Sequence, residues 1–535
     1  MSDPWWRTSV LYQVYWRSFR DGNGDGLGDL EGLIQGLDHI TSLGVDGIWI
    51  NPMYPSPQRD HGYDVADYVG VDHRFGDLET FEAFLKACHA RDLVVLLDIV
   101  PNHCSNEHPW FRSALASPED PMRAWFHFLP GRGRDGNLPP NEWRSIFGGP
   151  AWTRIEEADG SLGPWYMHTF DASQPELNWN EPAVWDAMED VLRFWFDRGV
   201  DGFRIDVAHG PIKAPDYPPI THPHDAFIER WDQPGIHEIY RRWRAIADSY
   251  DPPRVFLGEI HVETDERLME YLGPDGLHLA FQFSFLKAEW TVESLGDIIR
   301  SALAFAASAD APATWVLSNH DEPRHLSRFA PTSPEGGLDL QRGATRARSL
   351  LMVMLSLPGT VTLYNGEELG LPQVEDLADE VRQDPAFLRQ PPGSTYKGRD
   401  GCRIPLPWSA RQEHAGFSSV PPWLPMPSGW ADHSVEQQEV DPASMLTFYR
   451  RILSLRRRTL RGRGTVEFVE AGAGLLAYRV HNEQEVHRIC VNLSDAPARI
   501  VSGAPGEVLR AESISDSWKA RMLPPDGAIW TSWSL

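Results

Sequence analysis

Three acidic residues of this chain stand at or near the ends of short apolar runs. Asp206 and Glu259 each follow such a run directly, and Asp321 lies a few residues after a third. Runs of this kind are typical of parallel strands, whose carboxyl ends meet at one edge of a sheet. Carboxylates brought together there repel one another, which raises the pKa of one member. Glycoside hydrolysis needs one ionised and one protonated carboxyl group, so these residues predict a site for that chemistry.

The elements that must position these residues can be read from the same pattern. Eight apolar runs recur, and most are followed by residues at the three- and four-residue spacing of a helix face. The predicted strands are residues 10–15, 47–50, 94–100, 202–205, 255–258, 279–283, 314–317 and 361–364. Eight strand–helix repeats over about 400 residues predict an α/β fold, a (β/α)8 TIM barrel. In that fold the active site lies at the carboxyl ends of the strands.

Long segments without helical spacing interrupt the barrel after its third, fourth and eighth predicted strands. The largest is expected to be an irregular inserted domain at residues 105–177. It would separate a first part of the catalytic barrel, residues 1–104, from the remainder at 178–460. Short alternating segments then predict a C-terminal antiparallel β-domain, a sandwich, at residues 461–535.

Composition and charge narrow the classes of partner. The 535 residues carry 49 Lys and Arg against 76 Asp and Glu, and the net charge of -27 argues against nucleic acid. No apolar run reaches about 18 residues, so no membrane segment is expected. The polar start does not resemble a signal peptide, and four scattered cysteines favour a reducing, cytoplasmic location. No organic cofactor is expected, and the oligomeric state stays open.

Four motifs stand on the predicted strands in an order typical of one family. They are Asp98-Ile-Val-Pro-Asn-His103, Gly202-Phe-Arg-Ile-Asp206, Gly258-Glu259 and Asn319-His-Asp321. They resemble the four conserved regions of the α-amylase family, glycoside hydrolase family 13. The loop at 21–29 and the segment 398–408 are similar to those of the oligo-1,6-glucosidase and α-glucosidase branch. The resemblance covers essentially the whole chain.

The resemblance implies a role for each carboxylate and a retaining reaction. It assigns Asp206 as the nucleophile, Glu259 as the general acid and then base, and Asp321 as the carboxylate that grips the sugar hydroxyls. Arg204 stands two residues before Asp206 and would therefore lie on the same face of its strand. A charge-assisted hydrogen bond from Arg204 would hold the nucleophile ionised.

Further residues are expected to hold the glucose ring. Contacts to its face or hydroxyls are implied for Tyr63, His103 and His320. Asp64 and Arg403 resemble a pair that clamps the hydroxyl at the non-reducing end and closes the pocket beyond one glucose. Arg399 competes with Arg403 for this role, and spacing does not separate them.

The expected function is a retaining exo-α-glucosidase acting by double displacement on short oligosaccharides of the maltose, isomaltose and sucrose class. A transglycosylating relative, of the sucrose isomerase or trehalose synthase type, would share the barrel and all three carboxylates. A non-catalytic amylase-like ectodomain would need a membrane span, which the sequence does not predict. Val207, which follows Asp206, does not decide between α-1,4 and α-1,6 linkages. Trp231 is a candidate for the leaving-group site.

A glycine-rich acidic loop near the start of the chain predicts a metal site. It places oxygen ligands at alternate positions around a tight turn, as calcium loops do. Gly32 stands where an EF-hand has its bidentate Glu, so the loop departs from that motif. Family resemblance suggests a structural Ca2+, with Mg2+ as an alternative, held by Asp21, Asn23, Asp25, the Leu27 carbonyl and Asp29.

Overall fold

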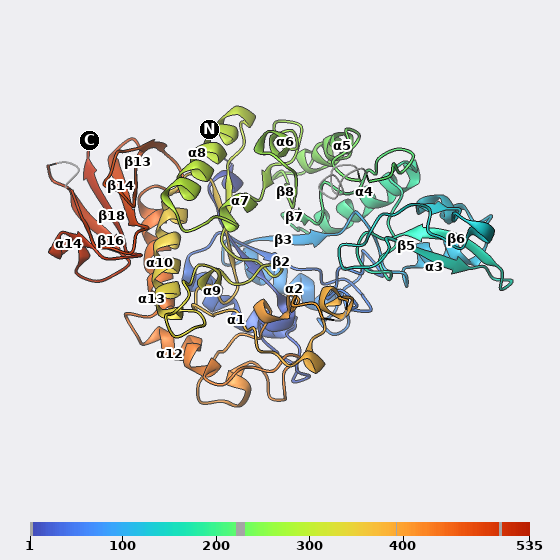
Figure 1. Ribbon diagram of the computed structural model, residues 1–535, viewed down its shortest axis with the longest axis horizontal. Coiled ribbons are helices and arrows are strands. Elements are labelled where there is room, and N and C mark those ends of the chain that lie inside the picture. Colours follow the sequence, from blue (N-terminus) through green and yellow to red (C-terminus); the bar gives the residue numbers. More distant parts are fainter. Residues whose placement is uncertain (1–3, 221–229, 392, 502–504) are drawn as a thin grey trace.

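The centre of the molecule is a parallel sheet of eight strands, in the order β10-β11-β1-β2-β3-β7-β8-β9. The computed structural model describes residues 4–220, 230–391, 393–501 and 505–535 (Figure 1). The strands are β1 (Val10–Val14), β2 (Gly47–Ile50), β3 (Val94–Ile99), β7 (Gly202–Ile205), β8 (Val255–Gly258), β9 (Leu279–Ala280), β10 (Thr314–Val316) and β11 (Thr360–Tyr364). A parallel bridge between Phe281 and Thr314 brings the two edges together, so the sheet is a nearly closed barrel.

The strands coincide with the predicted apolar runs because both of their faces are covered. Leu11, Trp49 and Leu257 belong to a buried cluster inside the barrel. Neighbours of the opposite parity, such as Ile48 and Leu97, pack in the larger cluster beneath the helices. A strand buried on both faces needs a continuous apolar run rather than an alternating one. The predicted barrel is confirmed.

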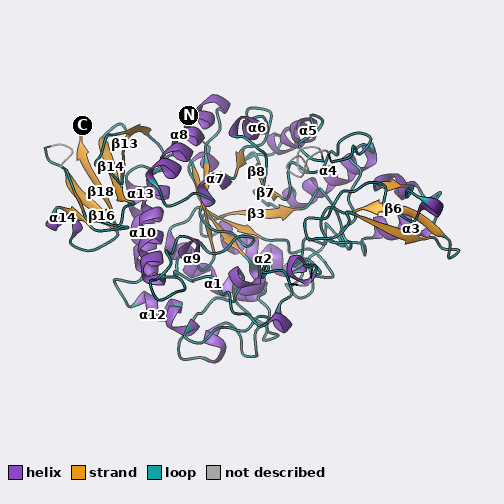
Figure 2. Cartoon of the chain, viewed as in Figure 1, coloured by secondary structure: helices purple, strands orange, loops and turns teal. Residues whose placement is uncertain are grey.

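Helices surround the barrel (Figure 2). The longer ones are α1 (Leu30–Leu43), α2 (Leu78–His89), α4 (Pro182–Phe196), α5 (Ile236–Asp248), α8 (Val292–Ala309), α10 (Leu340–Ser356) and α13 (Met445–Arg458). The short ones are α6 (Asp265–Met269), α7 (Phe283–Leu286), α9 (His325–Arg328), α11 (Pro385–Leu388) and α12 (Val435–Glu439). Local residues set their ends: Asp29 caps α1 by accepting from the Gly32 N–H, and Gly44 ends it at φ 81°.

The segment after β3 carries more regular structure than expected. It contains α3 (Pro109–Ala116) and a small antiparallel sheet, ordered β4-β6-β5. The strands are β4 (Phe128–Leu129), β5 (Trp152–Glu156) and β6 (Leu162–Met167). Buried Trp143, Trp152 and Met167 give this inserted sheet a core of its own. Part of the interruption after the fourth predicted strand, residues 221–229, lies outside the described residues.

A second antiparallel sheet ends the chain, as predicted. Its five strands, ordered β12-β13-β14-β18-β16, are β12 (Thr465–Phe468), β13 (Leu475–His481), β14 (Glu485–Asn492), β18 (Ala528–Ser534) and β16 (Val508–Glu512). A two-stranded pair, β15 (Ala498–Arg499) with β17 (Met522–Leu523), and the short α14 (Ser517–Ala520) accompany it. Buried Asp526 joins this sheet to α10 by pairing with Arg342 at 2.6 Å and Arg346 at 2.8 Å. Within the described ranges, the helices are all too short or too polar to cross a bilayer.

Candidate active site

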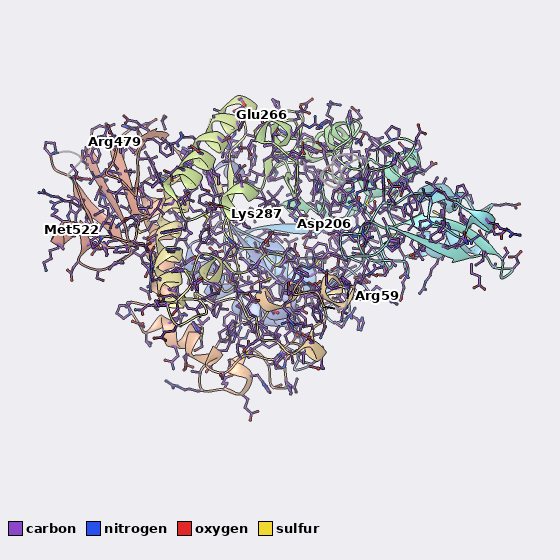
Figure 3. The ribbon with its side chains drawn as sticks, viewed as in Figure 1. Arg59, Asp206, Glu266, Lys287, Arg479 and Met522 are labelled. Carbon is purple, nitrogen blue, oxygen red and sulfur yellow. The ribbon has the colours of Figure 1, made fainter. Side chains whose placement is uncertain are left out.

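The predicted acidic residues meet at the carboxyl ends of the barrel strands. Asp206 directly follows β7, and Glu259 directly follows β8. Figure 3 labels Asp206 near the middle of the molecule. Buried Arg204 of β7 lies 2.8 Å (Nη1) from Asp206 Oδ1 and 2.6 Å (Nη2) from Glu259 Oε2. Its Nη1 also lies 2.8 Å from Asp98 Oδ1 of β3, so one guanidinium holds three carboxylates from three strands.

This single cation does not neutralise the three carboxylates. Burial, helped by the neighbouring charges of Glu259 and Asp98, raises the pKa of Asp206 well above its usual range against the opposing effect of Arg204. Burial likewise raises the pKa of Asp98 to about 7. Burial also acts on Glu259, but Arg204 and His261 outweigh it and hold the pKa of Glu259 below its usual range. Burial and the neighbouring charges therefore favour protonation of Asp98 and Asp206 over protonation of Glu259.

Asp321 lies across the pit in the loop after β10, and cations hold it. Its Oδ1 accepts from Arg399 Nη1 at 2.9 Å and from Arg403 Nη2 at 3.0 Å, while His320 Nε2 lies 3.2 Å from Oδ2. Burial opposes ionisation, but His320 and the two guanidinium groups outweigh it and keep the pKa of Asp321 below its usual value. Asp321 is thus held ionised, in the form that can accept hydrogen bonds.

Arg399 closes one end of the pit by pairing with acidic residues of three loops. Besides Asp321, its Nη2 lies 2.8 Å from Asp60 Oδ1 and 2.7 Å from Asp384 Oδ1. Asp384 is fully buried and also caps α11 by accepting from the Ala386 N–H at 3.0 Å. The Arg399 charge holds the pKa of Asp384 far below its usual value despite burial. We call Arg399, Asp60, Asp321 and Asp384 the closed end of the pit.

The predicted pairing of Asp64 with Arg403 is wrong. The Asp64 carboxylate is fully buried and accepts from a serine hydroxyl at 2.9 Å and from two N–H groups of its own turn at 2.9 and 3.0 Å. Arg403 donates instead to Asp321 and to the His320 carbonyl. The turn passes through Gly62 at φ 103°, and Asp60 at its start is the residue that pairs with the closing arginine, Arg399.

The aromatic and imidazole residues predicted to hold glucose line the same pit. Tyr63 stacks on His320 with ring centroids 5.4 Å apart, and its hydroxyl lies 2.8 Å from His320 Nε2 and 3.0 Å from Asp98 Oδ2. His103 Nε2 lies 3.1 Å from the Gln174 side-chain amide. Burial lowers the pKa of both His103 and His320 to about 3, so each ring is neutral and has one N–H to donate.

A cavity of about 1050 Å3 is lined by Glu259, Asp321 and Arg399. Val207 and Trp231 both line it, so the residue predicted for the leaving-group site does face that space. Val207 has a φ of 43°, which is unusual for a β-branched residue. Its N–H donates to Glu259 Oε2 at 3.0 Å, so this strained backbone fixes the Glu259 carboxyl group.

The acidic loop near the start of the chain satisfies its own oxygens. The Asp21 carboxylate accepts from two glycine N–H groups at 2.6 and 2.8 Å, and Asn23 and Asp25 accept from the N–H two residues later at 3.0 and 2.9 Å. Asp29 caps α1 through the Gly32 N–H. Across the described residues, three or more His, Cys, Asp or Glu side chains do not gather around a metal position. A carboxylate has about four lone-pair sites, so these hydrogen bonds do not decide whether the loop binds a cation, and the predicted metal site stays a prediction.

The (β/α)8 barrel gathers three carboxyl groups around Arg204 at its strand ends, which is an arrangement that glycoside hydrolysis can use. The chain belongs to the α-amylase family, because the family model described as "Alpha amylase, catalytic domain" matches residues 13–462.

Known proteins of this family are similar to the chain over most of its length. A probable α-glucosidase of Rhizobium meliloti (strain 1021) is 39% identical over 520 residues, covering 92% of this chain and 90% of the relative. An oligo-1,6-glucosidase of Parageobacillus thermoglucosidasius is 33% identical over 493 residues, covering 86% and 84%. The crystal structure of the α-glucosyl transfer enzyme XgtA, 32% identical, superposes with a TM-score of 0.87 over 99% of this chain and 100% of that one. The protein is a glycoside hydrolase of the α-glucosidase type.

Proposed function

We propose that the enzyme is a retaining exo-α-glucosidase, which removes terminal non-reducing α-linked glucose from short oligosaccharides. The observation that carries this proposal is the shared guanidinium of Arg204, which holds Asp206 and Glu259 within 2.8 and 2.6 Å of its two nitrogens. A nucleophile and an acid so closely linked suit a retaining mechanism, which needs no room for a water between carboxylate and sugar.

Each carboxyl group has a defined part in the double displacement. Ionised Asp206 attacks the anomeric carbon while Glu259 gives its proton to the leaving oxygen, which departs as an alcohol. Glu259, now ionised, takes a proton from water, and the resulting hydroxide attacks the glucosyl ester on Asp206. The productive form therefore has Asp206 ionised and Glu259 protonated.

The closed end supports exo-action. Arg399 spans the pit between Asp60, Asp321 and Asp384, so a second sugar on the non-reducing side would have to displace buried ion pairs. Breaking such pairs leaves uncompensated buried charges, which costs several kcal/mol, on the order of 3–5. A single glucose with a free non-reducing end avoids that cost.

Side-by-side kinetics test the proposal. We would measure kcat/KM for maltose, isomaltose, sucrose and maltotriose and follow the anomer of the released glucose by NMR. The expected result is glucose cut one unit at a time, released first as the α-anomer. β-Glucose as the first product, or maltose cut from within a longer chain, would contradict the proposal.

Transglycosylation is the second candidate, and the similarity to an α-glucosyl transfer enzyme favours it. In that reaction a sugar hydroxyl replaces water as the group that attacks the glucosyl ester on Asp206. The same experiment separates the two, because a sucrose isomer or trehalose would then exceed free glucose among the products.

Two further properties stay predictions. A structural Ca2+ in the loop of Asp21 and Asp29 would raise the melting temperature by binding the folded state, with no effect on kcat/KM. Melting scans with and without a chelator, at matched ionic strength, test this, and an unchanged melting temperature would contradict it. We also propose a cytoplasmic location, which the four free, buried cysteines support.

A further inference from the structure

A second cavity lies on the face of the barrel opposite the catalytic pit. It has a volume of about 260 Å3 and is bordered by Val10 at the start of β1, by Asp46 just before β2, and by the end of α13. In a parallel barrel the amino ends of the strands face away from the carboxyl ends, so this cavity is separate from the site described above. Pockets for larger organic ligands commonly measure about 300–1,000 Å3, so this cavity suits a small ligand.

Arginine side chains make up one wall of this cavity. Residues 456–463 include five arginines, in a chain whose acidic residues outnumber its basic ones by 76 to 49. Three of the five line the cavity, and we call them the arginine wall: Arg456, Arg457 and Arg461. The Arg461 N–H donates to the Arg456 carbonyl oxygen at 2.7 Å, so the chain folds back after α13 and brings Arg461 beside the end of the helix. Arg461 adopts a φ of 52° there, which is uncommon for a residue other than glycine.

The charges of the arginine wall are not matched by ion pairs in the described part of the chain. Arg456 is buried, and its guanidinium donates to three main-chain carbonyl oxygens at 2.5 to 2.9 Å rather than to a carboxylate. Burial lowers the pKa of Arg456 to about 10, and the charge of Asp46 only partly opposes this effect. Arg457 and Arg461 are exposed, and among the described residues neither side chain forms a hydrogen bond or an ion pair.

Among the described residues that line the cavity, Asp46 is the one carboxylate. Its Oδ2 accepts from the Val10 N–H at 2.8 Å. Burial raises the pKa of Asp46, and that hydrogen bond and the charges of Arg457 and Arg456 oppose the rise. With Asp46 ionised, three guanidinium groups and one carboxylate leave the cavity with a net charge of +2. A phosphate group carries a charge of about -1.5 to -2 at pH 7 and would neutralise it.

We propose that this cavity binds a phosphate group, either as inorganic phosphate or as part of a small phosphorylated metabolite. Guanidinium groups suit this ligand, because their forked N–H donors match the geometry of phosphate oxygens. Arg456 is held in place by its carbonyl contacts, whereas the exposed side chains of Arg457 and Arg461 can turn towards the ligand. The ligand would link the amino ends of β1 and β2 to α13 without touching the carboxyl groups of the pit. Binding there does not depend on the proposed function.

Calorimetric titration of the full chain tests the proposal, with inorganic phosphate, glucose 6-phosphate and acetate as probes at neutral pH and matched ionic strength. We expect one phosphate site with a Kd of about 1 mM or tighter, and binding of the singly charged acetate that is weaker by about tenfold or more. In the double variant Arg457→Gln with Arg461→Gln, the phosphate affinity should fall by about tenfold or more. The matched control is Arg458→Gln with Arg499→Gln, which removes the same charge from exposed arginines outside the cavity and should keep the wild-type affinity. Phosphate should also raise the melting temperature of the wild type and of the control, but not of the arginine-wall variant.

The same titrations distinguish the two sources of the phosphate group. Tighter binding of glucose 6-phosphate than of inorganic phosphate would support a phosphorylated metabolite as the ligand, and the reverse order would support inorganic phosphate. A wild type that binds neither would overturn the inference, and so would acetate binding as tight as that of phosphate. Equal affinities in the arginine-wall variant and the control would also overturn it. If phosphate competes with maltose while the arginine-wall variant keeps its affinity, the anion binds in the catalytic pit and the inference fails.

Discussion

The closed end and the aromatic lining of the cavity adjoin each other, because the Arg399 guanidinium lies 5.0 Å over the Phe147 ring, yet they are built differently. At the closed end Arg399 joins Asp60, Asp321 and Asp384 through contacts of 2.7 to 2.9 Å. Along the aromatic lining, the ring centroids of Phe170 and Trp231 lie 6.1 Å apart and those of His209 and Trp231 lie 4.9 Å apart.

This difference separates strict from tolerant recognition. Directional ion pairs reject a ring that lacks a hydroxyl or carries an extra group, because buried charges are then left unpaired. Apolar walls discriminate weakly, by a factor of about 10–200 for a missing methylene. The enzyme should therefore be selective for glucose and permissive towards what glucose is attached to.

The largest effect is expected from Asp206→Asn, which removes the nucleophile that we propose. We expect kcat/KM to fall by about 10^4-fold or more for every leaving group. The melting temperature should not fall, because the change relieves repulsion among carboxylates that share Arg204. Steady-state kinetics and calorimetry check both points, and a variant retaining a tenth of the wild-type rate would refute the assignment.

Glu259→Gln should separate substrates by their leaving groups. We expect a loss of about 10^3-fold for methyl α-glucoside, whose alkoxide needs protonation, and less than about tenfold for α-glucosyl fluoride. Both substrates place the same glucose at the closed end, so the comparison isolates proton donation. Equal losses for the two would argue against Glu259 as the acid.

Arg399→Lys should weaken glucose binding without regard to the leaving group. Lysine keeps the charge but cannot span Asp60, Asp321 and Asp384 at once, so we expect kcat/KM to fall by about 100-fold for methyl and hexyl α-glucosides alike. Arg267→Lys, on the rim of the leaving-group side, is the matched control and should cost less than about threefold. If the loss at Arg399 depended on the alkyl chain, the difference in recognition between the closed end and the aromatic lining would be refuted.

The smallest effect is expected on the pH dependence of stability, because the pit contains buried titratable side chains. Burial lowers the pKa of His103, His320 and His209 to about 3. Because these values lie below the unfolded value of about 6.5, the stabilisation is full above that pH and is lost as pH falls towards 3. Asp60 and Asp98, with pKa values of about 6 and 7, act in the opposite sense: their contribution is present at low pH and lost as pH rises.

Buried histidines with lowered pKa values outnumber the carboxyl groups with raised ones, since His127, His278 and His325 behave in the same way. We therefore expect the melting temperature to fall by a few degrees, on the order of 2–5 °C, between pH 7 and pH 5. Calorimetry in two buffers of different ionisation enthalpy should report net proton uptake on unfolding. Net proton release would contradict the expectation.

The meeting of Asp206 and Glu259 was predictable from sequence because strand pattern fixes where strand ends meet. A short run that is apolar except for Arg204 ends at Ile205, so Asp206 emerges at the carboxyl edge of the barrel, and Glu259 likewise follows a run that ends at Gly258. The buried run and the charged residue after it are both visible without coordinates. The inserted sheet was harder to foresee, because short strands in a segment rich in Gly and Pro have weak periodicity.

The closed end could not be assigned in the same way. Asp60 and Asp64 stand four residues apart in one turn, and the positive φ of Gly62 decides which of them reaches the closing arginine. Arg399 and Arg403 present the same ambiguity. Asp384 lies in an irregular segment, and its partner Arg399 is 15 residues away, so neither period nor motif marks it. The Asp–Pro start of α11 was its one local signal, and that signal predicts a helix cap rather than a partner for arginine.

The ion pairs between Asp526 and α10 predict how the enzyme would respond to truncation. A chain that ends at residue 460 would lack Asp526, so Arg342 and Arg346 would lose the counter-ion that they share. It would also lack Tyr478, so the surface of α10 around Ser349 would become exposed. The last 75 residues therefore cannot be deleted without loss of these contacts to α10. A shortened gene product should be recovered as inclusion bodies, whereas the whole chain can be handled as one cooperative unit.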